Sequence, residues 1–488
     1  MKNHYTSLLG RLSVFSLSLI LLSSAAMATS KKLTKDELID KVITTYGGDK
    51  LLQLSDLTVS DKYKVFSLDQ GPDPAFNGVT TLYSELLIDF GSAKKLIKNW
   101  RQDHNGNQLR GTLFDGQSGW NINYLRGSHV KNNNVSTNTV GAGMMKMIDT
   151  LLVRQLAIHR DNAHIISTKN LLGQPIYALT FTAHDNKQYI LETDASSGLV
   201  LSMLIGKSPN TGRLYQFSQH KKQEGITFAH NMDMFIAGEP RFVTTARSVK
   251  INQLTSQAFV LPKKSKQLQG LTNNSTMTVK QLADDVYLVG EQTRFSIFVD
   301  AGEYYVGAGG LGGIDKRLSA LNKHLNKQNQ IKVQVIPDHH RGHLGALAKL
   351  AEMNTPVLIA PTHRKIVESM YKNNNEIEEV SNLVRLAGGK VEVYNIHTAH
   401  ANNYLLFYLP AEKLVFSADH FGTSLINALP GANNTVKSLH REINRLGIPV
   451  SRYANAHSAR VLNQSDLEMV LSDYEVAPCP LAHSFCQI

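Results

Sequence analysis

The feature of this sequence that most constrains its fold is a group of aspartate and histidine residues placed directly after an apolar segment. Residues 331–336 form the apolar run of a buried strand, and Asp338, His339, His340 and His343 follow at once. Ring nitrogens and carboxylate oxygens that leave one turn together can converge on a point that a cation occupies. The sequence therefore predicts a metal site at the end of this strand.

The spacing resembles the signature of the metallo-β-lactamase superfamily, His-x-His-x-Asp-His followed by a helix that begins with small residues. His340 and His343 stand at the second and third histidines of that signature. Asp338 replaces the first histidine, and Gly342 replaces the aspartate. A carboxylate is an acceptable zinc or iron ligand, so the first departure is compatible with metal binding, whereas glycine offers no ligand.

Three later residues follow in the order that the superfamily has them. His400 precedes a strand, Asp419 ends the next strand, and His457 lies in a turn further along the chain. They are similar to the superfamily's later histidine, its bridging carboxylate and its terminal histidine. This order implies that residues 276–476 fold as a metallo-β-lactamase-like αββα sandwich.

The resemblance implies two candidate metal sites. The first would contain Asp338, His340 and His400, with one position open for water. The second would contain His343, Asp419 and His457. The expected cofactor is a divalent metal, with zinc favoured and iron as the alternative, present as one or two ions.

Structural roles are the alternative for each candidate. A single buried histidine is more often a hydrogen-bonded core group than a ligand, and aspartate is a preferred helix cap. Asp338 could therefore cap the helix that begins near Gly342, and Asp419 could cap a turn. An eroded, inactive site stays open as a further alternative.

Four more histidines lie near these motifs. His339 and His420 stand next to superfamily positions and are candidate replacements for the ligand missing at Gly342, with a supporting or surface role as the alternative. We interpret His363 and His397 as non-ligands.

The amino terminus has the features of a secretory signal. Lys2 and Arg11 supply the positive region, residues 12–22 form an apolar core, and residues 26–28 give a small-x-small cleavage pattern. An uncleaved anchor helix is the alternative, but the run is shorter than the roughly 20 residues that a span needs. We expect a bacterial protein that starts near Thr29, has no transmembrane span once mature, and is periplasmic or secreted.

The composition excludes some classes of partner. The 488 residues carry a formal charge of +11, but the lysines are scattered and the basic, aromatic-interleaved patches of nucleic-acid binders are missing. A basic exported protein favours association with anionic surfaces or substrates. Cys479 and Cys486 are the only cysteines and could close a tail loop in an oxidising compartment.

The length of the chain and the change in its sequence pattern from the first to the second half predict an α+β protein of two domains. Residues 29–265 alternate between short strands and turns and read as an antiparallel β-rich half-barrel, with helices at residues 33–46 and 140–158. A polar linker at residues 263–275 leads to the αββα domain, where strands alternate with helices. Residues 477–488 form a tail.

The turn pattern of the first domain resembles the periplasmic lipoprotein-carrier and lipoprotein-sorting family. The residues that carry the likeness are residues 46–48, 115–120 and 191–200. The resemblance implies a concave apolar face that could hold a lipid or an acyl chain. The alternative is a sheet that serves as a packing platform for the second domain.

Together these features predict an exported metal-dependent hydrolase that uses a metal-activated water on an ester, lactone, thioester or related bond. Its substrate would be a small molecule or an acyl-bearing compound. The alternative is a non-enzymatic periplasmic protein that binds a lipid or apolar ligand and has a degenerate metal site. An iron-containing redox protein of the same fold is disfavoured by Gly342.

Overall fold

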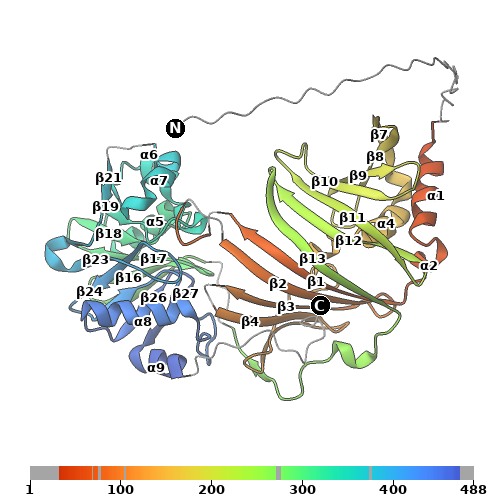
Figure 1. The fold of residues 1–488 in the computed structure, drawn as a ribbon. Helices are drawn as coiled ribbons and strands as arrows, with labels where there is room; N and C mark the ends of the chain where they lie inside the picture. The colour runs from red at the N-terminus through yellow and green to blue at the C-terminus, as the bar shows by residue number, and fades with distance from the viewer. Residues whose placement is uncertain are drawn as a thin grey trace, which may run out of the picture.

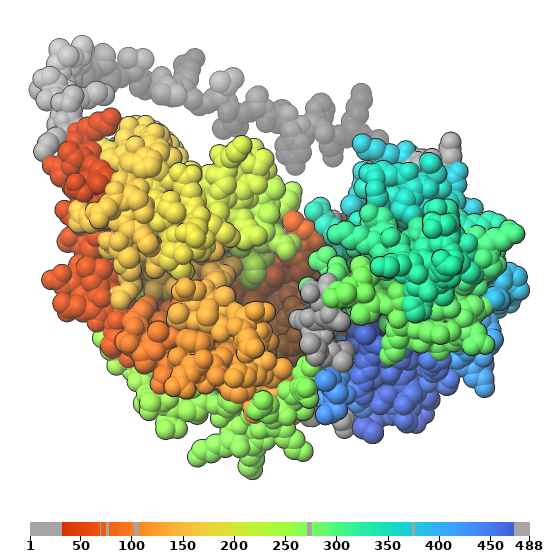
Figure 2. All heavy atoms as spheres, turned by 180° about the vertical axis from the view of Figure 1, so that it is seen from behind, coloured from red at the N-terminus to blue at the C-terminus, as the bar shows by residue number. Residues whose placement is uncertain are grey.

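The computed structural model describes residues 32–68, 70–74, 78–103, 106–270, 276–372 and 376–472. The expected signal peptide, the tail at residues 477–488, and Cys479 and Cys486 lie outside the described residues. The described chain forms an N-terminal and a C-terminal region, which lie side by side (Figure 1, Figure 2). Among the helices of the described chain, none has the length and apolar character needed to cross a membrane.

One large sheet dominates the N-terminal region. Its strand order is β14-β6-β5-β4-β3-β2-β1-β13-β12-β11-β10-β9-β8-β7, and all neighbours are antiparallel except the parallel pair β14 and β6. The strands are β1 (Asp56–Ser67), β2 (Gly78–Asp89), β3 (Lys94–Asp103), β4 (Gly106–Phe114), β5 (Gly119–Asn123), β6 (Ser128–Lys131), β7 (His164–Leu171), β8 (Gln174–Thr182), β9 (Gln188–Asp194), β10 (Val200–Ile205), β11 (Arg213–Gln223), β12 (Ile226–Ile236), β13 (Glu239–Ile251) and β14 (Lys266–Leu268).

Short helices cover one face of this sheet. The helices are α1 (Lys35–Thr45), α2 (Asp49–Leu52), α3 (Ala142–Met145) and α4 (Asp149–Ile158), with 3-10 turns η1 (Arg160–Asn162) and η2 (Ser256–Phe259). Thr34 starts α1 with a capping box, because its side chain accepts from Glu37 N while Glu37 accepts from Thr34 N. The buried side of α4 packs with α1 and with alternate strand residues such as Val59 and Leu86 into one apolar core.

Two sequence predictions for this region need correction. The helix predicted over residues 140–158 is broken, because Ile148 is extended and the Met147 carbonyl accepts a hydrogen bond from Arg247. The segment 263–275 is not wholly a linker. Lys266–Leu268 forms β14, which pairs with β6, and residues 271–275 lie outside the described residues.

The C-terminal region contains two sheets, ordered β15-β16-β17-β18-β19-β20-β21 and β22-β23-β24-β25-β26-β27. Their strands are β15 (Thr278–Ala283), β16 (Val286–Glu291), β17 (Arg294–Asp300), β18 (Tyr304–Ala308), β19 (Gln330–Val335), β20 (Val357–Ile359), β21 (Ile377–Glu379), β22 (Leu383–Leu386), β23 (Val391–Ile396), β24 (Tyr404–Leu409), β25 (Leu414–Phe416), β26 (Arg452–Asn455) and β27 (Ser458–Asn463). The helices and 3-10 turns are α5 (Ile314–Leu325), η3 (Arg341–Leu344), α6 (Leu347–Glu352), η4 (Pro361–His363), α7 (Arg364–Met370), η6 (Ala387–Gly389), α8 (Asn434–Leu446) and α9 (Gln464–Ser472).

Buried side chains order these elements into four layers. One core contains side chains from both sheets, such as Ile297 and Phe407, together with side chains of α8 and α9. A second core joins the outer face of the first sheet to α5, α6 and α7. Helices therefore cover the outer faces of two packed sheets, which is the predicted αββα order.

One helix of this region begins later than the sequence predicts. The helix after the histidine motif begins at Leu347, because a 3-10 turn over Arg341–Leu344 precedes it. Further along the described chain, α7 is followed by strands β21 and β22.

Candidate metal centre

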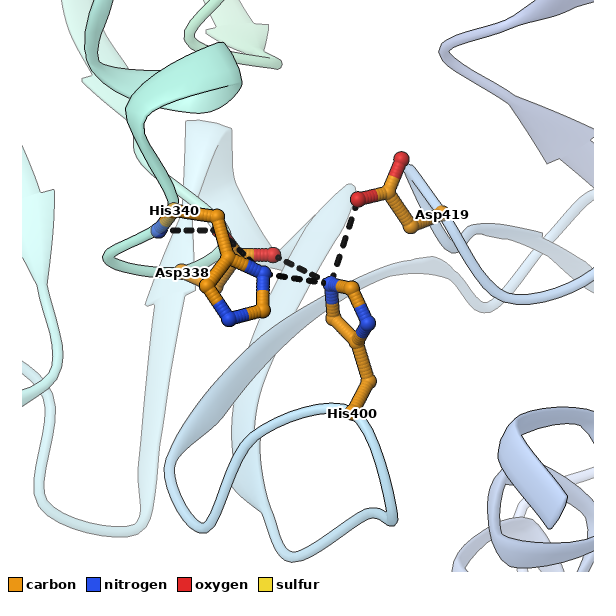
Figure 3. Close-up of side chains that lie close together, drawn as sticks. All are labelled: Asp338, His340, His400 and Asp419. Atoms are coloured by element: carbon orange, nitrogen blue, oxygen red, sulfur yellow. Dashed lines mark hydrogen bonds and ion pairs between the residues drawn. The ribbon is translucent and has the colours of Figure 1, made fainter. Parts of the chain in front are cut away.

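The candidate site lies where loops of the two C-terminal sheets meet. Asp338 and His340 follow β19, His400 lies between β23 and β24, and Asp419 follows β25. The four side chains point toward one another from these separate loops (Figure 3). Asp338 and His340 are 0% and 2% exposed, so the site is closed from solvent on their side.

The first group of ligand atoms surrounds His400. Asp338, His340, His400 and Asp419 each offer one ligand atom, and these atoms lie within 4.8 Å of one another. His400 Nε2 lies 2.8 Å from His340 Nδ1, 3.3 Å from Asp338 Oδ2 and 3.1 Å from Asp419 Oδ2. A ring nitrogen carries at most one proton, so one N–H cannot satisfy all three neighbours.

The second group is built on the same aspartate. His343 Nε2 lies 3.0 Å from Asp419 Oδ2, and His457 Nε2 lies 2.6 Å from Asp419 Oδ1. Asp419 therefore joins the two groups through its two oxygens. The side chain of His457 is 46% exposed, so this group opens to solvent.

Two of these histidines donate a hydrogen bond to a backbone carbonyl. His340 Nε2 lies 3.2 Å from the Gly71 carbonyl, and His457 Nδ1 lies 3.0 Å from the Thr293 carbonyl. A carbonyl only accepts, so each of these ring nitrogens carries the proton. In the neutral ring of His340, Nδ1 is then a lone pair, and it faces the cluster.

The donor set fits a divalent metal. Ligands on a tetrahedral zinc at about 2.0–2.1 Å stand roughly 3.3 Å apart, close to the separations around His400 Nε2. Imidazole nitrogens and carboxylate oxygens are the donors that zinc binds in catalytic sites. A cation between these atoms would satisfy lone pairs that a single proton cannot, so Asp338, His340 and His400 are suited to hold one.

Without a metal, protons hold the cluster together. Burial alone would lower the pKa values of His343 and His400, but Asp419 and Asp338 raise them to about 9 and about 10. Burial would raise the pKa values of both carboxyls, yet the surrounding histidines hold them well below the usual range. Two imidazolium groups therefore oppose two carboxylates at neutral pH, and metal binding would displace their protons.

A second layer of hydrogen bonds supports the loop that carries His400. The ring of His420 lies 3.1 Å from the Ser417 carbonyl through Nδ1 and 2.9 Å from Thr398 Oγ1 through Nε2. Thr398 Oγ1 in turn accepts from His400 N at 3.2 Å. His420 thus supports a ligand loop without joining either group.

A glycine loop presses against the turn that carries His343. A Cβ at Gly310 would lie 1.5 Å from the His343 carbonyl oxygen, so only glycine permits this approach. The Gly310 carbonyl accepts from Ala346 N at 2.8 Å, which ties the loop to the start of the following helix.

The structure brings all six sequence-predicted candidates into these two groups. Asp338 accepts from His340 N at 2.9 Å within its own loop, but the predicted capping role is wrong, because His340 stands at the start of the 3-10 turn and Ala346 at the start of α6, and neither start has a side-chain cap. Gly342 is exposed, and a Cβ there would meet no atom within 4 Å. Neither His339 nor His420 belongs to a group, so neither takes the place of the ligand missing at Gly342.

Sequence reasoning missed the contacts that the N-terminal region makes here. His339 Nε2 lies 3.1 Å from the Gly71 carbonyl, and Asn402 Nδ2 donates to Asp73 Oδ2 at 2.6 Å. Backbone carbonyls leave no signal in a sequence, and residues 71–73 are far from the histidine motifs along the chain. His363 is buried beside His339, and His397 is exposed; neither belongs to the two groups.

Searches of family models and of curated proteins found no match to this chain. Among solved structures, the chain is similar to a metallo-β-lactamase from Pontibacter korlensis, with 20% identity, a TM-score of 0.33, and 40% of this chain and 98% of that chain covered. It is also similar to the metallo-β-lactamase FIM-1 from Pseudomonas aeruginosa in a mono-zinc form, with 14% identity, a TM-score of 0.32, and 41% and 95% covered. The likeness of the N-terminal region to lipoprotein-carrier proteins stays a prediction.

Proposed function

We propose that this protein is a metal-dependent hydrolase that acts on an ester, lactone, thioester or related bond. The proposal is carried by the convergence of Asp338, His340, His400 and Asp419, whose ligand atoms lie within 4.8 Å of one another. A divalent metal in this group, zinc by preference, would lower the pKa of a bound water toward neutrality and polarise the scissile carbonyl or phosphoryl group.

Each residue has a separate role in this proposal. Asp338, His340 and His400 are the metal ligands. Asp419 Oδ2, 3.1 Å from His400 Nε2, accepts the proton of the attacking water. His343 Nε2 lies 3.0 Å from Asp419 Oδ2, so this ring can take up the water's proton from Asp419 and pass it to the leaving group.

The charge of the cluster supports one metal rather than two. Asp338 and Asp419 are its two carboxylates, and together they balance one divalent cation. A second cation at His343 and His457 would lack a carboxylate of its own, because Gly342 offers none. We therefore propose one tightly held metal per chain.

We further propose that the protein is exported to the bacterial periplasm or beyond and acts on a small or acyl-bearing molecule. The export proposal is supported by the pattern of the first 28 residues, and the acyl proposal by the likeness of the N-terminal region to lipoprotein carriers. A lipid-binding protein without hydrolytic activity is the alternative, since Gly342 departs from the superfamily signature.

The test compares the wild type with His400→Ala, measuring bound metal by elemental analysis and hydrolysis with a panel of chromogenic esters, thioesters and lactones. We expect about one zinc per wild-type chain, and both metal and hydrolysis lowered about 100-fold or more by His400→Ala. His324→Ala is the matched control, because His324 is exposed on α5 and belongs to neither group.

Two outcomes would count against the proposal. Hydrolysis that persists in His400→Ala at normal metal content would rule out this ligand assignment. A wild type that carries lipid, holds no metal and hydrolyses none of the panel would favour the binding protein.

A further inference from the structure

We propose that the tip of the β1–β2 hairpin, residues 70–74 of the N-terminal region, positions a ligand of the metal centre. The Gly71 carbonyl would orient the ring of His340, so that the ligand set is complete only when the two regions are joined. This inference rests on the proposed function, because it assigns the hairpin a role toward the metal held by His340.

The hairpin projects from the large sheet toward the C-terminal region. β13 pairs with β1 only as far as Val65, whereas β2 continues to pair with β1 up to Ser67 and Gly78. The last residues of β1 and β2 therefore form a two-stranded ribbon beyond the edge of the sheet. In Figure 1 these strands point at the C-terminal region.

The tip contacts the loop that carries His340. The Gly71 carbonyl lies 3.2 Å from His340 Nε2 and 3.1 Å from His339 Nε2, and Gly71 is buried. A carbonyl oxygen has two lone pairs, so it can accept from both rings. His340 Nε2 therefore donates to a main-chain oxygen of the N-terminal region.

The tip is also attached to the loop that carries His400. Asn402 N donates to the Pro72 carbonyl at 2.8 Å, and Asn402 Nδ2 donates to Asp73 Oδ2 at 2.6 Å. Asn402 is two residues from His400, so the tip connects the loops of two proposed ligands. A backbone bond from Leu405 N, in β24, to the Pro337 carbonyl, at 2.8 Å, also holds the strand after the His400 loop against the start of the Asp338 loop.

These contacts have a chemical consequence at His340. The bond to Gly71 places the proton on Nε2 and leaves Nδ1, the atom 2.8 Å from His400 Nε2, as the lone pair that faces the site. Partners of this kind fix the tautomer and orientation of a histidine ligand, and their loss typically costs about 10- to 100-fold in metal affinity. Gly71 is thus a positioning residue that acts through His340.

The first experiment deletes residues 70–74 from the full chain. Zinc affinity is measured by competition with a chelator, and the absorption spectrum of bound Co²⁺ reports the ligand geometry. We expect zinc affinity to fall about 10- to 100-fold and the Co²⁺ spectrum to change. Wild-type zinc affinity and an unchanged Co²⁺ spectrum in a folded deletion variant would overturn the inference.

A second experiment uses an exchange that keeps the chain length. Asn402→Asp sets two carboxylates against each other at the hairpin contact and should weaken zinc binding. Adding Asp73→Asn restores a donor opposite an acceptor with the wild-type net charge, and should recover both the affinity and the Co²⁺ spectrum. No loss in the single variant, or no recovery in the double variant, would contradict the hairpin's role.

Asn403→Asp is the matched control for added charge. It places the same negative charge one residue away and keeps the acceptor that Asn395 Nδ2 uses at 3.2 Å. We expect this control to bind zinc at least as tightly as the wild type, because a negative charge nearby attracts the cation. A wild type without metal would contradict the proposed function itself. Zinc affinity that is unchanged in the hairpin variants would contradict this inference alone.

Discussion

Each of the two regions buries a cluster of charged side chains, and the buried charges are compensated in different ways in the two clusters. In the N-terminal region, Arg247 donates to Asp61 through Nε at 2.7 Å and Nη2 at 2.9 Å. It also donates to the carbonyls of Ala229 and Met147, and Tyr63 donates to Asp61. Donors meet acceptors throughout this cluster, and Asp61 holds the pKa of Arg247 above its usual range despite burial.

The cluster in the C-terminal region lacks this complementarity. His340 presents a lone pair to a nitrogen of His400 that two carboxylates also approach. Its metal-free form depends on raised pKa values at His343 and His400, whereas arginine carries its charge without any such shift. Burial and charge alone do not distinguish a structural cluster from a ligand site. The distinguishing property is whether donors and acceptors match without an added cation.

The largest expected effect is on stability, through the Asp61–Arg247 cluster of the N-terminal region. Arg247→Met would leave the Asp61 carboxylate buried without its partner, which costs on the order of 3–5 kcal/mol of unfolding free energy. Urea denaturation of the metal-loaded protein measures this loss. If the cluster is purely structural, the variant should still hold wild-type metal at low temperature.

The double variant Asp61→Leu with Arg247→Met sharpens the same test. Removing both charges removes the uncompensated carboxylate, so we expect a substantial part of the lost stability to return. A double variant as unstable as Arg247→Met would mean that the bonds to Ala229, Met147 and Tyr63, not the ion pair, dominate.

The next largest effect is on zinc affinity, through the cluster of the C-terminal region, whose donors and acceptors do not match. Asp419→Asn removes the negative charge next to the proposed ligands while keeping the size of the side chain, so zinc affinity should fall about 10- to 100-fold. Chelator competition measures the affinity, with Asp315→Asn on α5 as the charge-matched control outside both groups. Unchanged zinc affinity in Asp419→Asn would show that this carboxylate does not serve the metal.

A smaller expected effect is a gradual change of metal-free stability and of zinc affinity with pH. His343 and His400 have folded-state pKa values of about 9 and about 10, above the usual value of about 6.5 for histidine. Their contribution to metal-free stability is therefore present below pH 6.5 and lost as pH rises through 9 and 10. Zinc must displace these protons, so its apparent affinity should rise with pH about tenfold per unit for each proton released.

Two measurements check this pH dependence. Titration calorimetry of zinc binding at pH 7, in buffers of different ionisation heat, should detect proton release. Urea denaturation should show metal-free stability falling between pH 6.5 and pH 10, with a weaker fall in the zinc-loaded protein. Zinc binding without proton release would mean that the two rings are already neutral in the metal-free protein.

The sequence predicted the candidate site better than it predicted the surroundings. Asp338, His340, His400 and Asp419 follow strand ends, where side chains must converge once the strands pair, so their order along the chain was informative. The αββα layers followed from the alternation of apolar strands and helices. Neither inference required knowing how the two regions meet.

What the sequence could not predict depends on contacts that have no local pattern. The Gly71 carbonyl reaches His340 only because β1 and β2 extend past β13, and a main-chain oxygen is the same in every residue. The break between α3 and α4 likewise depends on Arg247, about 100 residues further along the chain, bonding to the Met147 carbonyl. Periodicity alone therefore predicts one continuous helix there.

The smallest expected effect comes from restoring the carboxylate that the superfamily signature has at Gly342. Aspartate fits this exposed position, because a Cβ there meets no atom within 4 Å and the backbone needs no positive φ. We expect Gly342→Asp to leave the melting temperature nearly unchanged and to raise bound zinc from about one to about two ions per chain, as measured by elemental analysis.

Gly342→Asn is the matched control, since it has the same shape without the charge and should stay near one zinc. If a wild type with no metal gained zinc only in Gly342→Asp, the natural site would be a decayed one. If both variants stayed at the wild-type content of one zinc, residue 342 would not reach His343 and His457, and the unmatched lone pairs around His400 would be the whole of the metal site.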